Sequence, residues 1–194
     1  FRVLTEHTAS PGYGLSFLEE NGSRRALWTI RDATGSQQLY YSSRIQVAPQ
    51  ARASEVPPPA PTSDVVWERP YDTAASQVID RAWSRSADPF TFTRELIREF
   101  SEERQGENAR LLLTQFDRVP LLVRLLNQAD ISARKVSGLM LEDGRRRQSL
   151  TPWIQVYDGE EQSLFDPSTG KQGRPDNLLL WENAGQSVLE VQGG

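Results

Sequence analysis

The sequence contains no cysteine among its 194 residues. A thiol nucleophile, a disulfide bond and a cysteine-ligated zinc site are therefore excluded. The only histidine, His7, has no second ligand beside it that would support a metal site. We therefore expect His7 to be an ordinary surface residue, and we predict neither a metal site nor a cofactor.

Methionine and long apolar runs are also scarce. Met140 is the only methionine, and because the sequence does not begin with one, we expect it to be part of a longer protein. No apolar run approaches the ~20 residues that span a bilayer, and no signal peptide is visible, so any membrane anchor is expected outside these residues. The 22 basic and 26 acidic residues leave a net charge of -4, which indicates no nucleic-acid partner.

Composition divides the chain into three segments. Residues 1–48 contain short runs of β-forming residues, at 27–30 and 39–41, with a hairpin turn signal at Asn21-Gly22. Residues 49–64 carry five prolines and predict an extended linker. Residues 65–194 then form the main domain. Because two or three hairpin strands are barely stable alone, we expect the first segment either to pack on the rest of the chain or to pair with strands that precede these residues.

Three helices are predicted at the start of the main domain. Asp72 is expected to cap a helix that runs to about Ser84, and Asp88-Pro89 to start a second helix that ends near Gly106. A third helix should begin near Asp117. The apolar positions of these helices follow helical spacing: Ala75, Val78, Ile79 and Ala82; Phe92, Leu96, Ile97 and Phe100; Leu121, Leu122, Leu125, Leu126 and Ala129.

The third helix positions the candidate site. Pro120 falls in its first turn, where a missing N–H costs little, and Gln115 should lie just outside its N-terminus. Helices followed by strands predict an α+β domain, with helices packed on an antiparallel sheet and a small β segment in front. The strands are expected at about 131–142, 152–158, 162–166, 178–181 and 188–191.

Four segments of the main domain resemble the core of the transglutaminase-like superfamily, whose fold is of the cysteine-proteinase type. In that superfamily a cysteine opens a long helix, which ends in a segment like GIPARxVxG; an HxWxEV strand and a DPT turn follow. Residues 117–138 read DRVPLLVRLLNQADISARKVSG, 151–157 read TPWIQVY, and 164–168 read LFDPS. The matching positions are Ile131 to Arg134, Val136, Gly138, Trp153, Val156, Asp166 and Pro167.

The departures from that pattern concern the catalytic residues. Counting back from Ala133 puts the cysteine position on Gln115, and the histidine position falls on Thr151. Only the aspartate, Asp166, is retained. A thiolate paired with a histidine is the nucleophile of this chemistry, whereas a glutamine amide is no nucleophile and a threonine is no base near neutral pH. The resemblance therefore implies an inactive, degenerate triad.

The pattern is similar in particular to the bacterial family of inactive transglutaminase-like domains fused to seven transmembrane helices. The segment from Gly12 to Tyr41 also looks like that family's region before the core. The resemblance implies a non-catalytic binding or sensing domain on the periplasmic side of a bacterial inner-membrane protein. Its partners would be the membrane, through segments outside these residues, and a peptide, a cell-wall fragment or another protein.

Each candidate position has a functional and a structural interpretation. Gln115, Asp117, Thr151, Trp153 and Asp166 are the candidate ligand-binding residues of the former catalytic cleft. Structurally, Gln115 is a polar loop residue that caps the helix, Thr151 an ordinary residue at a strand edge, and Asp166 a turn former. Trp153 is either a cleft wall or a core residue, while Ile154 and Val156 on the other face of the strand belong to the core.

Arginines provide further candidates. Arg145, Arg146 and Arg147 could contact lipid phosphates or an acidic partner, or form a solvated hairpin tip. Arg134 could be a buried ion-pair partner or an anion clamp. Two other functions stay open: a structural module that docks a protein partner, and a hydrolase with a relocated nucleophile such as Ser149 or Asp117.

Overall fold

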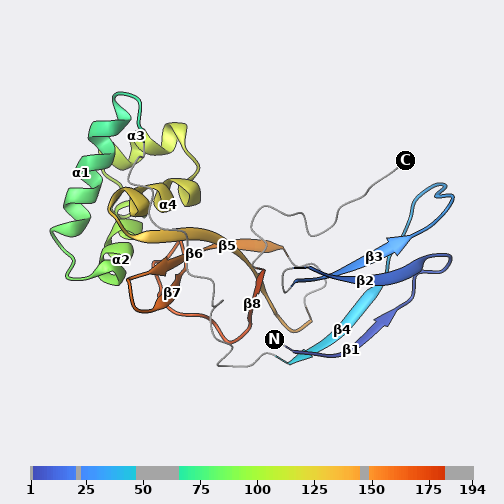
Figure 1. Ribbon diagram of the computed structural model, residues 1–194. Coiled ribbons are helices and arrows are strands. Elements are labelled where there is room, and N and C mark those ends of the chain that lie inside the picture. Colours follow the sequence, from blue (N-terminus) through green and yellow to red (C-terminus); the bar gives the residue numbers. More distant parts are fainter. Residues whose placement is uncertain (1, 21–22, 47–65, 145–148, 182–194) are drawn as a thin grey trace. The chain divides into compact units, whose positions relative to one another are not determined.

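The computed structural model describes residues 2–20, 23–46, 66–144 and 149–181, and it divides them between two compact units. The first unit contains residues 2–46 and the second contains residues 66–181 (Figure 1). The proline-rich segment 49–64, the arginines Arg145 to Arg147 and the strand expected at 188–191 lie outside the described residues. The predicted three-part division of the chain therefore stays a prediction.

The first unit consists of two antiparallel ribbons. Strand β1 (Arg2–Thr8) pairs with β4 (Tyr41–Gln46), and β2 (Gly14–Glu20) pairs with β3 (Ser23–Thr29). The β2–β3 pairing confirms the predicted hairpin, in which Phe17 lies opposite Ala26. The run at 39–41 was predicted as a strand, but β4 begins only at Tyr41. The peptide N–H of Tyr40 instead donates to the Ser10 hydroxyl, and its carbonyl accepts from Ala9, so a loop contact takes the place of the strand.

The two ribbons share little apolar contact. Trp28 of β3 meets Tyr41 of β4 edge-on, with ring centroids 5.9 Å apart. No side chain between residues 3 and 46 whose burial is described is fully buried. His7 is exposed, as expected. Several large apolar side chains of this unit are exposed as well: Leu4, Leu18, Leu27, Ile30, Leu39, Tyr40 and Tyr41.

Four helices open the second unit: α1 (Tyr71–Trp83), α2 (Pro89–Glu99), α3 (Glu107–Gln115) and α4 (Arg118–Gln128). The predicted apolar faces of α1, α2 and α4 are confirmed, since they are buried in one core. Asp117 is the N-cap residue of α4 by its extended backbone, and Pro120 lies in the first turn, both as predicted.

Two helix boundaries differ from the prediction. Asp72 is not the cap of α1, because the helix begins one residue earlier, after Pro70, and Asp72 lies in its first turn. The second predicted helix does not reach Gly106, because α2 ends at Glu99 and a turn follows. Gly106 is instead the N-cap of a separate helix, α3, which was not predicted from the sequence.

The strands of the second unit form one antiparallel sheet in the order β7-β6-β5-β8. Their bounds confirm four of the predicted strands: β5 (Ser132–Met140), β6 (Leu150–Tyr157), β7 (Gln162–Phe165) and β8 (Leu178–Trp181). Figure 1 shows the helices gathered over one end of this sheet, with β8 beyond them. The predicted class, helices packed on an antiparallel sheet after a small β segment, agrees with this mixed α/β architecture.

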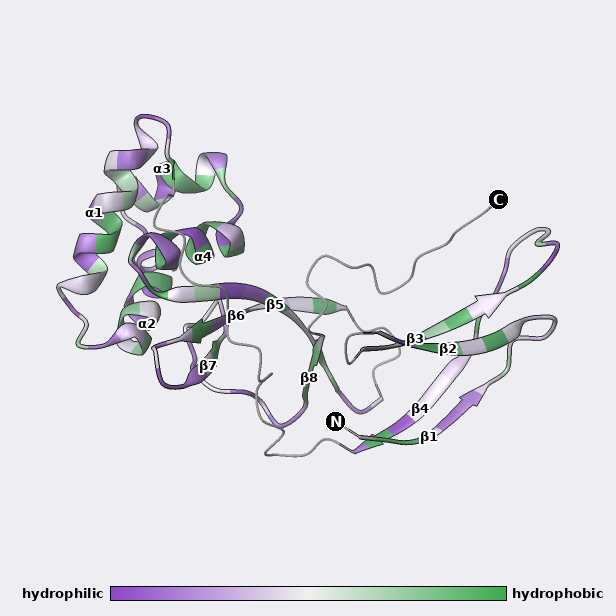
Figure 2. Cartoon of the chain, in the orientation of Figure 1, coloured by the Kyte–Doolittle hydropathy of each residue, from purple (hydrophilic) through white to green (hydrophobic). Residues whose placement is uncertain are grey.

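The two faces of the sheet belong to different apolar clusters. Ala133, Ile154, Val156 and Phe165 pack with the helices in the main core. The opposite face carries a smaller cluster, to which β8 contributes; in Figure 2 this strand is hydrophobic along its length. Its buried residues are Val136, Trp153, Leu164 and Leu178. Because successive residues of a strand point to opposite sides, Ile154 lies in the main core and its neighbour Trp153 lies in the smaller cluster.

The N-terminus of α2 supports a prediction about pH. Asp88 accepts hydrogen bonds from the backbone amides of Phe90 and Thr91, and the Thr91 hydroxyl accepts from the backbone N–H of Asp88, which completes a capping box. The hydrogen bond from the Thr91 amide holds the pKa of Asp88 below its ordinary value. Asp88→Ala should therefore lower the free energy of unfolding by about 1 kcal/mol at neutral pH.

The pH dependence of this contribution follows from the lowered pKa. The charge-dependent part is fully present above about pH 4, where the unfolded aspartate is ionised, and is lost as the pH falls through the folded pKa. Asp88→Asn is the control, because asparagine also accepts the capping hydrogen bonds but has no charge and does not titrate. Denaturation followed between pH 2 and 7 should show the wild type losing its advantage over Asp88→Asn in acid; a constant difference would contradict the assignment.

Candidate functional site

Gln115 and Asp117 lie on either side of the junction between α3 and α4. Gln115 is the last residue of α3, and its side chain is exposed. Asp117 is exposed too, and although it is the N-cap residue of α4, its side chain makes no capping hydrogen bond. Gln115 therefore precedes the N-terminus of α4, as predicted, but it ends a helix of its own instead of lying in a loop.

Thr151 and Trp153 belong to β6 and pair with β5. Strand β7 pairs with β6 only from Ile154 to Tyr157, so Thr151 has no strand on its other side among the described residues, which agrees with the predicted strand edge. The Thr151 hydroxyl donates to the carbonyl of Gly138 over 3.1 Å and accepts from the indole Nε1 of Trp153 over 3.2 Å. Trp153 is 8% exposed and belongs to the smaller cluster. Both side chains therefore take part in the packing on the face of the sheet that carries the smaller cluster.

Asp166 follows β7 and organises the next turn. Its carboxylate accepts from the backbone amide of Ser168 over 2.8 Å and from the Thr169 hydroxyl over 2.9 Å. Its backbone N–H donates to Lys171, and its carbonyl accepts from Gly170. The aspartate thus has the hydrogen bonds of a turn former, and its carboxylate is half-buried.

The structure does not bring the candidate positions into one site. Helix α4 packs on the face of the sheet that carries Ile154 and Val156. Thr151 shares the opposite face with Trp153, because the two residues are two apart in the strand and are hydrogen-bonded to each other. No hydrogen bond among the described residues joins any two of the positions Gln115, Thr151 and Asp166.

Arg134 lies opposite Gln155 on the same face as Trp153. Its Nε donates to Oε1 of the buried Gln155 over 2.7 Å, and Gln155 in turn donates to Gln162. This partner of Arg134 is a neutral amide and not a carboxylate, and no ion pair joins the guanidinium to any residue that the structure describes. Its Nη2 is buried and makes no hydrogen bond with any residue that the structure describes.

Arg118, the first residue of α4, was not among the predicted site residues. Its side chain is half-buried, and its Nε and Nη2 are fully buried. Neither nitrogen has a hydrogen-bond partner in the part of the chain that the structure describes. Buried polar groups without partners are rare because each costs roughly 1–3 kcal/mol, and more when charged. The guanidinium therefore has hydrogen-bond donors that no described residue uses.

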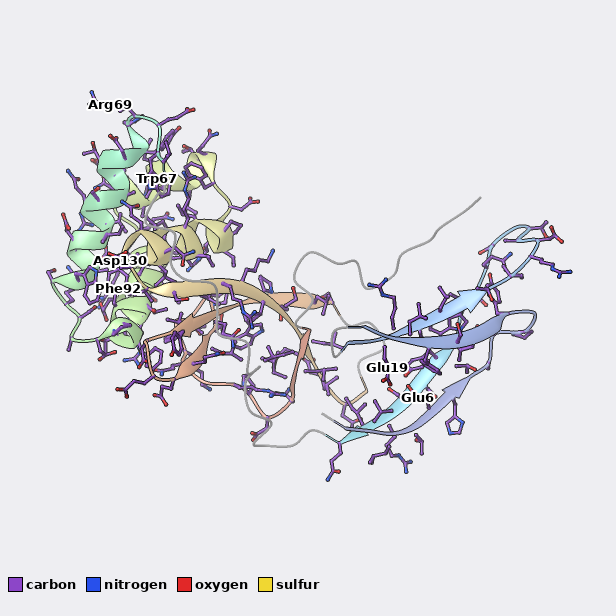
Figure 3. The ribbon with its side chains drawn as sticks, in the orientation of Figure 1. Glu6, Glu19, Trp67, Arg69, Phe92 and Asp130 are labelled. Carbon is purple, nitrogen blue, oxygen red and sulfur yellow. The ribbon has the colours of Figure 1, made fainter. Side chains whose placement is uncertain are left out.

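An aromatic cluster stands beside this junction. Phe116, between α3 and α4, meets Trp67 and Tyr71 edge-on, at centroid distances of 5.3 and 5.6 Å. The guanidinium of Arg124 lies over the Trp67 ring, 3.9 Å from its centroid. Figure 3 labels Trp67 among the helices. Edge-to-face pairs and a cation over an aromatic face both stabilise such a cluster, so the α3–α4 junction is held in place.

Two hydrogen bonds complete this contact. The Trp67 indole donates to Gln128 over 2.7 Å, and Arg124 donates to the carbonyl of Val66. Together with the aromatic cluster they form what we call the clasp, which joins residues 66 and 67 to α4.

These observations define a mixed α/β protein with antiparallel sheets and four helices among the described residues. The chain belongs to the family described as inactive transglutaminase fused to 7 transmembrane helices, whose model matches residues 1–116. The family predicted from the sequence is thereby confirmed, and its description as inactive agrees with the missing cysteine. No curated protein and no solved structure matches the chain.

The matched region ends at the α3–α4 junction, so it covers Gln115 but not Asp117, Thr151, Trp153 or Asp166. Within the described residues, no helix is long and apolar enough to cross a membrane. The same residues include no group of three or more histidine, cysteine, aspartate or glutamate side chains that could hold a metal ion.

Proposed function

We propose that this chain is a non-catalytic binding or sensing domain of a bacterial multi-pass membrane protein, with the transglutaminase-like core and on the periplasmic side of the inner membrane. Membership of a family fused to transmembrane helices supports the membrane attachment. The lost catalytic role is supported by the absence of cysteine and by Gln115 and Thr151 at the aligned positions. The two residues also lie on different elements, Gln115 at the end of α3 and Thr151 in β6, and no hydrogen bond among the described residues joins them.

Arg118 carries the binding part of the proposal. A ligand that presents carboxylate or amide oxygens, such as a peptide or the stem peptide of a cell-wall fragment, would satisfy its two buried nitrogens. The exposed amide of Gln115 adds a further hydrogen-bonding group near the α3–α4 junction. Asp117 disfavours a second anionic group and so favours a ligand with one carboxylate next to neutral amides. The clasp holds the junction that carries these groups.

The test is a thermal-shift screen and titration calorimetry with short peptides, polyglutamate and peptidoglycan stem peptides. At least one probe is expected to bind, and Arg118→Met is expected to weaken it by about tenfold or more, because a hydrogen bond to a charged group is lost. The free energy of unfolding should not fall, and should rise by about 1 kcal/mol or more, because the substitution removes two buried nitrogens that have no partner among the described residues.

Arg110→Met is the matched control, since Arg110 is an exposed arginine of α3. The proposal fails if no probe binds, or if Arg118→Met and Arg110→Met bind equally well. A topology reporter fused after Gly194 in the full-length protein tests the location, and activity of that reporter on the cytoplasmic side would contradict it.

A second candidate function is the docking of a protein partner by the β2–β3 ribbon. Leu18 is 51% exposed and Leu27 is 41% exposed, and their neighbouring cross-strand pairs put both on one face. Strand β2 pairs only with β3 among the described strands, which leaves strand edges of the kind to which another protein strand adds. In the same titrations, loss of binding by Leu18→Ser with Leu27→Ser, but not by Arg118→Met, would favour docking.

A further inference from the structure

A second cluster of charged groups lies away from the α3–α4 junction. Arg81, Arg85, Glu99 and Arg104 line an open depression of about 640 Å³. Arg81 and Arg85 are one turn apart, at the C-terminal end of α1 and just after it, and Glu99 ends α2. Arg104 comes from the turn that precedes α3. All of these elements belong to the second unit, so the depression is complete within it.

Glu99 arranges two of the arginines. Its side chain is only 4% exposed, and its two oxygens accept separately, from Nη1 of Arg81 over 3.0 Å and from Nη1 of Arg85 over 2.9 Å. The buried carboxylate thus holds two guanidinium groups side by side, although they would otherwise repel each other. Their side chains remain 40% and 49% exposed, so donors other than these two can face the depression.

The cluster carries more positive charge than its carboxylates neutralise. Among the described residues that line the depression, Glu99 is the only acidic one, against three arginines. Arg104 approaches Glu95 only at 3.6 Å, and Glu95 is already bonded to Arg98 at 2.5 Å. Glu95 and Arg98 carry opposite charges, so counting them as well still leaves the cluster with an excess of two positive charges. The whole chain, by contrast, carries a net charge of -4.

Gly106 leaves room for the Arg81 side chain and places the N-terminus of α3 beside the cluster. A Cβ atom on Gly106 would lie 3.1 Å from Nη1 of Arg81, so the glycine leaves space for this guanidinium. Gly106 is also the N-cap of α3 and supplies no side-chain cap. The partial positive charge of that helix end therefore adds to the field of the three arginines.

We propose that the depression binds a phosphate or pyrophosphate group. Guanidinium groups recognise phosphate oxygens with paired N–H donors, and an anion of charge two or more matches the excess charge of the cluster. Glu99 prearranges Arg81 and Arg85, while Arg104 is held by a single long ion pair and is the arginine most easily turned toward the ligand. The phosphate could come from a soluble molecule or from a lipid headgroup.

Titration calorimetry of the chain with pyrophosphate and with inorganic phosphate tests the soluble source. Flotation with vesicles of phosphatidylglycerol, against vesicles of phosphatidylcholine, tests the lipid source. We expect saturable binding in at least one arm, which weakens when NaCl is raised from about 50 to about 500 mM. Arg104→Gln should weaken that binding about three- to tenfold, because one charged donor is lost from a half-exposed site.

Arg110→Gln removes the same charge from an exposed position of α3 and is the matched control. Binding to neither phosphate nor phosphatidylglycerol overturns the proposal, and so does an equal effect of Arg104→Gln and Arg110→Gln. Thermal melting confirms that the variants fold, and Arg104 is chosen because it does not contact Glu99. Arg118→Met should bind pyrophosphate normally, so failure here is distinguishable from failure of the proposed binding function.

Discussion

Replacing Phe92 by alanine is expected to lower the free energy of unfolding of the second unit by about 3–5 kcal/mol. Phe92 is fully buried in α2, and its ring stacks on Trp83 of α1, with centroids 4.4 Å apart and planes inclined by 28°. Truncation removes the buried ring and leaves a cavity, which the surrounding residues fill only in part. Loss of the aromatic stack adds to that cost.

Denaturation should be followed by helical circular dichroism, because all the described helices belong to the second unit and a two-unit chain need not unfold in one step. Phe90→Ala is the control on the same helix. Phe90 is half-buried and lies 6.0 Å from Phe165, so its truncation should cost clearly less. A cost below about 1 kcal/mol for Phe92→Ala would contradict the burial of Phe92 between α1 and α2.

Glu99→Ala is expected to lower the free energy of unfolding by about 2–3 kcal/mol. Breaking a buried ion pair typically costs 3–5 kcal/mol, because the charge left behind has no partner. The cost is smaller here, since Arg81 and Arg85 are each almost half exposed and can turn toward water. Their mutual repulsion, which Glu99 offsets, supplies part of the effect.

A double-mutant cycle isolates this contribution. If Glu99 stabilises by pairing with the arginines, Glu99→Ala should cost less in an Arg85→Gln background than in the wild type. Glu95→Ala is the comparison, because Glu95 is 14% exposed and bonds to arginines that are about half exposed, so its loss should cost under about 1 kcal/mol. Equal costs for Glu99→Ala in both backgrounds would remove the pairing argument.

Local signals in the sequence predicted most of the second unit. Asp88-Pro89 marks the start of α2 because a capping carboxylate and a proline both suit a first turn. The leucines of α4 and the alternating residues of β6 predicted which faces are buried. Helix α3 was missed because Gly106 was interpreted as the end of the second helix, whereas it is the N-cap of α3, and glycine is common at either end of a helix.

The candidate site was harder to predict than the fold. Motif spacing assigned Gln115 and Thr151 to the cysteine and histidine positions, but spacing does not determine on which face of the sheet a side chain lies. In the structure, the hydrogen bond between Trp153 and Thr151 puts Thr151 on the face away from α4. Arg118 gave no signal in the sequence, because arginine is an ordinary helix residue and only tertiary packing buries its nitrogens.

The clasp connects the start of the second unit directly to α4, and this has a mechanical consequence. Trp67 and Gln128 are 61 residues apart in the sequence but share a hydrogen bond, as do Val66 and Arg124, which are 58 apart. A pull on the chain at Val66 therefore reaches α4 across two hydrogen bonds and an aromatic contact, without passing through α1, α2 and α3. Tension applied at Val66 would therefore act directly on α4, the helix that begins with Arg118.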